Sequence, residues 1–128
     1  MVEKILIVED NPQNLLLMVD ILTARGYDVV QAHDGAEGIR LAREHRPELI
    51  LLDMQMPVMD GLEAARRLKA DPETAGIKIL AVTSFAMKGD RERILAAGCD
   101  EYMAKPIDTR QLPLLVRRLL DHEGGHGP

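Results

Sequence analysis

The sequence is poor in aromatic side chains, cysteine and positive charge, and each shortage excludes a class of function. Its 128 residues include no tryptophan, two tyrosines and one phenylalanine, too few for the base-stacking surfaces of single-stranded nucleic-acid binders. The single cysteine excludes an internal disulfide and a cysteine-based zinc site. Lysine and arginine total 16 against 21 acidic residues, a net charge of −5, so no basic nucleic-acid surface is expected.

Long apolar segments are also missing. The apolar run within residues 1–8 is too brief for a signal peptide, and no run approaches the roughly 20 apolar residues of a membrane span. A chain of 128 residues that is 46% hydrophobic can instead bury an aliphatic core within one domain. We therefore expect a single soluble, cytoplasmic domain.

Five short apolar runs alternate with helix-like segments. The first run, residues 4–8, is continuously apolar rather than alternating, as expected of a strand covered on both faces. Strands separated by single helices imply right-handed crossovers and an α/β fold, a doubly wound parallel sheet. The predicted strands are residues 4–8, 27–32, 48–52, 77–82 and 100–104.

Capping residues mark the predicted helices. Asn11 and Pro12 suit the start of a first helix that Gly26 closes, and Asp34 with Glu37 forms a capping box. The predicted helices are residues 12–25, a segment after Asp34 that ends before Pro47, 61–70, 86–97 and 108–120, with Pro113 in a first turn. Residues 1–120 then form the domain, and residues 121–128 a flexible tail.

Polar side chains follow four of the five predicted strands. In open parallel sheets ligands bind beyond the carboxyl ends of the strands, so these side chains are expected to meet. They are Glu9 and Asp10 after the first strand, Asp53 after the third, Thr83 and Ser84 after the fourth, and Lys105 after the fifth.

Three adjacent carboxylates repel one another unless a cation lies among them. Oxygen ligands without histidine or cysteine favour Mg²⁺ or Mn²⁺. A lysine beside such a metal suits a phosphoryl group, and a carboxylate can act as the nucleophile that forms an aspartyl phosphate.

Together these residues resemble the receiver domains of bacterial two-component response regulators, over residues 4–120. The resemblance implies the flavodoxin-like strand order 2-1-3-4-5. It implies that Asp53 is the phosphoacceptor and that Glu9 and Asp10 hold Mg²⁺ with it, although many members have aspartate in place of Glu9. It also implies that the backbone carbonyl of Gln55 completes the metal shell, which leaves the Gln55 side chain little constrained.

The same resemblance implies a switch around the phosphoryl group. Thr83 matches the hydroxyl that turns toward it, Lys105 the ammonium that pairs with it, and Tyr102 the aromatic side chain that moves inward. Ser84 is small, which leaves the acyl phosphate accessible. The bond between Lys105 and Pro106 is expected to be cis.

Two segments resemble single-domain regulators of the DivK type, which control cell division and polarity. These segments are residues 10–14 and 85–90. The receiver domains of hybrid histidine kinases contain the same short motifs. We therefore expect a stand-alone regulator, of the DivK or the chemotaxis type, that takes phosphate from a histidine kinase or histidine phosphotransfer protein. Without an output domain, it would signal by binding a downstream protein or by passing the phosphate on.

The predicted first helix is apolar beyond one stripe, which indicates burial all round or a docked partner. In the family this helix supports docking of the phosphodonor, and Asn14, Leu17 and Ile21 are the candidate contacts. Plainer interpretations stay open for several residues: Asp53 as a turn residue, the acidic pair as helix-capping acids, and Tyr102 as a core side chain.

Two other functions compete with a phosphorylated switch. An aspartyl-nucleophile phosphatase usually has a second aspartate two residues after the first, where this chain has Gln55. A degenerate receiver that acts only as a binding module need not keep the carboxylates and Lys105. The expected protein is thus a phosphoacceptor with slow self-dephosphorylation rather than an enzyme.

Overall fold

The computed structural model describes residues 2–56, 59–84 and 88–124. The described segments form one five-stranded sheet in which every neighbouring pair is parallel, in the order β2-β1-β3-β4-β5, as predicted. The strands are β1 (Lys4–Val8), β2 (Asp28–Ala32), β3 (Leu49–Asp53), β4 (Lys78–Thr83) and β5 (Glu101–Ala104). The helices are α1 (Pro12–Ala24), α2 (Gly35–His45), α3 (Gly61–Ala70), α4 (Lys88–Ala96) and α5 (Gln111–Gly124).

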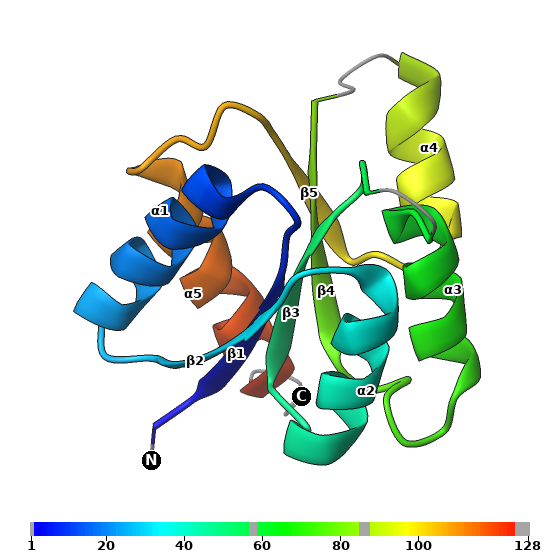
Figure 1. Ribbon diagram of the computed structural model, residues 1–128, viewed down its shortest axis with the longest axis horizontal. Helices are drawn as coiled ribbons and strands as arrows, with labels where there is room; N and C mark the ends of the chain where they lie inside the picture. Colours follow the sequence, from blue (N-terminus) through cyan, green and yellow to red (C-terminus); the bar gives the residue numbers. More distant parts are fainter. Residues whose placement is uncertain (1, 57–58, 85–87, 125–128) are drawn as a thin grey trace.

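Helices cover both faces of the sheet (Figure 1). Because successive strand residues point to opposite faces, Leu6 and Val8 of β1 pack in one core with α2, α3 and α4. Ile5 and Ile7 pack in the other core with α1 and α5. This double burial explains why β1 and β3 are continuously apolar. Among the described residues, no helix has the length and hydropathy needed to cross a membrane.

The predicted caps are present, with one difference. The Asn11 side chain accepts hydrogen bonds from the backbone N–H groups of Gln13 and Asn14. The Asp34 carboxylate accepts one from the N–H of Glu37, at 2.8 Å. The Glu37 carboxylate, however, accepts from the N–H of His33 at 2.6 Å, one residue before the position that the capping box requires.

The prediction for α5 is wrong at both ends. Its first residue is Gln111, three positions later than predicted, because the Asp108 carboxylate accepts hydrogen bonds from Arg110 and Gln111 and so acts as a cap. Pro113 remains in the first turn. The helix continues to Gly124, four residues into the segment predicted as a tail, and residues 125–128 lie outside the described residues. So do residues 86 and 87 of the predicted fourth helix.

Gly61 allows α3 to begin directly against the end of β3. A Cβ atom at this position would overlap the backbone oxygen of Asp53 and would lie 2.6 Å from Cα of Met54. The backbone of these two residues sets the direction of the Asp53 side chain. Close approach of the chain at Gly61 therefore contributes to the geometry of this sheet edge.

Gly61→Ala is expected to lower the free energy of unfolding by about 1–3 kcal/mol, because the added methyl group overlaps backbone that must shift. Urea denaturation measures this change. Gly76→Ala is the matched control, since a Cβ atom there meets nothing within 4 Å, and its effect should stay within about 0.5 kcal/mol. Equal stabilities of the two variants would contradict this account of Gly61.

Candidate functional site

The carboxyl ends of the central strands open into a cleft of about 560 Å³. The residues predicted from the strand ends meet there, although they lie far apart in the sequence. The cleft is lined by Glu9, Asp10, Asn11, Pro12, Asn14, Asp53, Gln55, Ser84 and Lys105. Sequence reasoning had not assigned Asn11 and Pro12 to the site, although their position directly after the acidic pair is the signal that could have done so.

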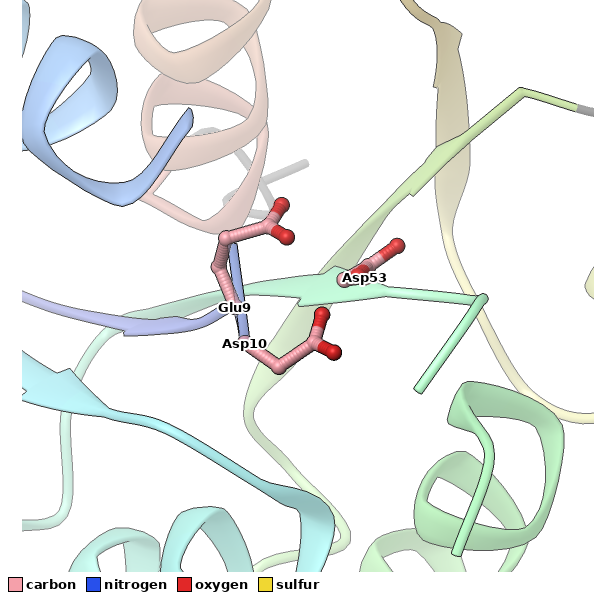
Figure 2. A group of neighbouring side chains, drawn as sticks. All are labelled: Glu9, Asp10 and Asp53. Carbon is pink, nitrogen blue, oxygen red and sulfur yellow. The ribbon is translucent and has the colours of Figure 1, made fainter. Parts of the chain in front are cut away.

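Three carboxyl groups gather at the carboxyl ends of β1 and β3 (Figure 2). Glu9, Asp10 and Asp53 each offer an oxygen atom within 4.8 Å of the others. Glu9 and Asp53 are buried and Asp10 is exposed. The N–H of Asn11 donates to Glu9 Oε2 at 3.1 Å, so the residue that caps α1 also orients a carboxylate of the cleft.

Burial and the neighbouring Asp53 raise the pKa of the Glu9 carboxyl from 4.5 to about 7. Burial contributes most, and the nearby Lys105 opposes the shift. Glu9 Oε1 and Asp53 Oδ2 are buried and accept no hydrogen bond from the described residues, although Lys105 Nζ lies within ion-pair distance of Glu9 Oε1. Buried, unsatisfied carboxylate oxygens close to a third carboxylate fit a hard divalent cation with oxygen ligands, such as Mg²⁺ or Mn²⁺.

The ammonium group of Lys105 contacts both buried carboxylates. Its Nζ atom lies 3.2 Å from Asp53 Oδ1 and 3.4 Å from Glu9 Oε1. The Lys105–Pro106 peptide bond is cis, as the resemblance implied, and the Lys105 N–H donates to the backbone oxygen of Thr83 at 2.8 Å. The end of β5 thereby holds a positive charge against the ends of β1 and β3.

The Gln55 side chain is held in place, which corrects the expectation that it is little constrained. Its Nε2 donates to Thr83 Oγ1 and its Oε1 accepts from the N–H of Ser84, each at 3.0 Å. Its own backbone N–H donates to Asp53 Oδ1 at 3.0 Å. Sequence reasoning missed these contacts because they join residues 28 and 29 positions apart.

Thr83 and Tyr102 are not among the described residues that line the cleft. Thr83 ends β4 and is fully buried, whereas Ser84 is exposed at the cleft. Tyr102 is half-buried in β5 and packs against the core that α2, α3 and α4 cover. The guanidinium of Arg91 in α4 lies 5.9 Å from the centre of its ring.

The candidate docking residues lie along α1. Asn14 lines the cleft, Leu17 is 37% exposed and Ile21 is half-buried. Leu16 is also 61% exposed, but it points to another side of the helix from Asn14, because residues two positions apart do not share a helix face.

The model of the family described as the response regulator receiver domain matches residues 5–117. The chain belongs to this receiver family. The polar-differentiation response regulator DivK of Brucella anthropi is 50% identical over 109 residues, which cover 85% of this receiver chain and 89% of that protein. The protein of the same name from Brucella ovis is 49% identical over the same length.

Solved structures agree with this assignment to the receiver family and to two-component signalling. A CheY-like receiver domain protein from Methanospirillum hungatei superposes with a TM-score of 0.91, at 30% identity, over 99% of this chain and all of that one (100%). The receiver domain of a sensor histidine kinase from Pseudomonas aeruginosa has a TM-score of 0.87 and 36% identity. The match covers 94% of this chain and 99% of that domain, which holds a magnesium ion in its active-site cleft.

Glu9→Gln is expected to raise the free energy of unfolding of the metal-free protein at pH 8, by roughly 1–3 kcal/mol. The folded-state pKa of about 7 exceeds the ordinary value of 4.5, so ionised Glu9 destabilises the fold increasingly as pH rises through this interval. The pH-dependent part of the gain should vanish by about pH 4, where glutamate and glutamine are both neutral.

Urea denaturation in EDTA at the two pH values measures this gain. Glu37→Gln is the control of opposite sign, because the hydrogen bond from the backbone of His33 lowers the pKa of Glu37, so removing its charge at pH 8 should not stabilise the protein. A Glu9→Gln variant no more stable than wild type at pH 8 would refute the predicted cost of the buried charge.

Proposed function

We propose that this protein is a DivK-like response regulator of a phosphorelay, in which Asp53 accepts a phosphoryl group from a phosphohistidine. The observation that carries the proposal is the placement of the Lys105 ammonium against Asp53 and Glu9, at 3.2 and 3.4 Å. The donor is a histidine kinase or a histidine phosphotransfer protein, and a downstream protein reads the modified form in the cytoplasm.

In the transfer step, a carboxylate oxygen of Asp53 forms a bond to phosphorus as the bond between phosphorus and the donor imidazole nitrogen breaks. The hydrogen bond from the Gln55 N–H and the Lys105 contact orient the Asp53 carboxylate. Glu9, Asp10, Asp53 and the Gln55 carbonyl would hold Mg²⁺ or Mn²⁺, which offsets negative charge on the transferred group. Lys105 adds a positive charge that pairs with a phosphoryl oxygen.

The aspartyl phosphate carries a charge of about −2. We assign Thr83, Ser84 and Lys105 to its recognition, and we assign the relay of the change to Tyr102. Because Tyr102 packs in the core beneath α4 and contacts Arg91, its movement would change the surface formed by α4, β5 and α5. That surface is the proposed binding face for the downstream protein.

The competing functions are less well supported. Gln55 stands where an aspartyl phosphatase needs its general acid, and its side chain is engaged with Thr83 and Ser84. A binding module without phosphorylation has no use for buried carboxylates that destabilise the fold. We therefore propose a phosphoacceptor that hydrolyses its own phosphate slowly.

Incubation with acetyl phosphate and Mg²⁺ is expected to add one phosphate to the chain, detected by intact mass spectrometry. The adduct should disappear in EDTA and in Asp53→Asn, because the first lacks the cation and the second lacks the nucleophile. Failure of the wild-type protein to form a Mg²⁺-dependent adduct would overturn the proposal. Rapid turnover of a phosphomonoester would instead favour the phosphatase.

Leu17→Asp is expected to slow phosphotransfer from a phosphorylated histidine phosphotransfer protein by about tenfold or more, because it places a charge on an apolar docking surface. Modification by acetyl phosphate, which needs no docking, should keep its wild-type rate. The matched control is Val2→Asp: Val2 is 67% exposed and precedes β1, at the edge of the sheet opposite the cleft. Equal transfer rates in the two variants would exclude α1 from the docking surface.

A further inference from the structure

The Gln55 side chain bridges two elements at the rim of the cleft. It extends from the segment after β3 to the end of β4, where its amide group makes one hydrogen bond to the hydroxyl oxygen of Thr83 and one to the backbone N–H of Ser84. Both distances are 3.0 Å. The same residue is tied through its own N–H to Asp53, so the bridge begins two residues from the proposed phosphoacceptor.

The groups that the amide engages are those that an anion on Asp53 would seek. The Ser84 N–H is a backbone donor on a residue that lines the cleft, and oriented backbone donors of this kind bind phosphoryl oxygens. In the described structure this donor is occupied by a neutral acceptor, Gln55 Oε1. The Thr83 hydroxyl is held on its acceptor side by Gln55 Nε2.

We propose that the Gln55 amide is a resting-state latch that competes with the phosphoryl group for Ser84 and Thr83. This inference rests on the proposed function, because it requires a phosphoryl group on Asp53. Hydrogen bonds to an anionic oxygen are roughly twice as strong as those between neutral groups. An oxygen of the phosphoryl group on Asp53 therefore displaces the Gln55 amide oxygen from the N–H of Ser84. The Thr83 hydroxyl turns toward the phosphoryl group as Gln55 Nε2 leaves it.

Gln55 is suited to this release. Its side chain is half-buried and faces the open cleft, so the amide can move into water, where it regains two hydrogen bonds. Its backbone remains attached to Asp53 and to β3. Breaking the two hydrogen bonds of the Gln55 amide thus adds a fixed free-energy cost to phosphorylation, and no group that the phosphorylated state needs is lost. Gln55 acts as a positioning residue for Thr83.

Removal of the amide should favour the phosphorylated conformation. Gln55→Met keeps the length of the side chain and lacks both hydrogen-bonding atoms, and Gln55→Ala lacks the atoms and the volume. We expect both variants to bind beryllofluoride, a phosphoryl mimic, in the presence of Mg²⁺ about tenfold more tightly than wild type, which corresponds to about 1.4 kcal/mol. Gln31→Met is the matched control, because Gln31 is an exposed residue of β2, and its affinity should equal that of wild type.

A second measurement tests the positioning of Thr83 without any phosphoryl mimic. In the metal-free protein labelled at threonine methyl groups, the Thr83 signal and its χ1 couplings should change in Gln55→Met and Gln55→Ala. They should be unaltered in Gln31→Met. A residue that merely fills space would alter this signal in the alanine variant and leave it unchanged in the methionine variant.

The outcomes separate the latch from the proposed function. If wild type binds beryllofluoride with Mg²⁺ and the two Gln55 variants bind it no more tightly, the latch is wrong and the proposed function stands. If wild type takes up none, the proposed function fails and the latch fails with it. A tenfold gain in the alanine variant alone would assign the effect to side-chain volume and would also overturn the latch.

Discussion

One ammonium group faces three carboxylates among the described residues that line the cleft, and this imbalance of charge governs the site. Lys105 reaches the two buried carboxylates at 3.2 and 3.4 Å, yet the pKa of Glu9 is still raised to about 7. Burial, together with the neighbouring Asp53, therefore outweighs the attraction of a single lysine. The strand ends hold a concentration of negative charge that a divalent cation would neutralise.

The fold tolerates this cost because the central strands β1, β3 and β4 are mostly aliphatic and buried. The apolar runs of β1, β3 and β4 supply two cores, and the carboxylates of the cleft lie at or just after the carboxyl ends of β1 and β3. Because Gly61 has no Cβ atom, the start of α3 can approach the backbone of Asp53 and Met54 closely. The apolar residues that stabilise the fold and the carboxylates of the cleft thus occupy different parts of β1 and β3. This arrangement lets a small domain keep buried carboxylates.

Most of the fold could be predicted from periodicity and caps. The predicted strand boundaries agree with the structure within about one residue, most simply for β1, β3 and β4, whose continuous apolar runs leave few alternatives. The differences between prediction and structure fall at helix ends, where side chains compete with backbone groups for hydrogen bonds. Asp108 caps the turn before α5 rather than joining the helix, and Glu37 bonds to His33 rather than to the residue that its motif implies. Such choices depend on local geometry that sequence spacing does not resolve.

The sequence alone predicted most of the residues that meet at the cleft, because parallel strands bring their carboxyl ends to one edge and polar residues follow four of the five predicted strands. Only the tertiary structure decided how those residues interact. Glu9 and Asp10 are adjacent in sequence, yet one is buried and the other exposed. The Gln55 amide is engaged with Thr83 and Ser84, 28 and 29 positions away. Burial and hydrogen bonding between distant strands depend on the packed neighbours of each atom, and these exist only once the sheet has formed.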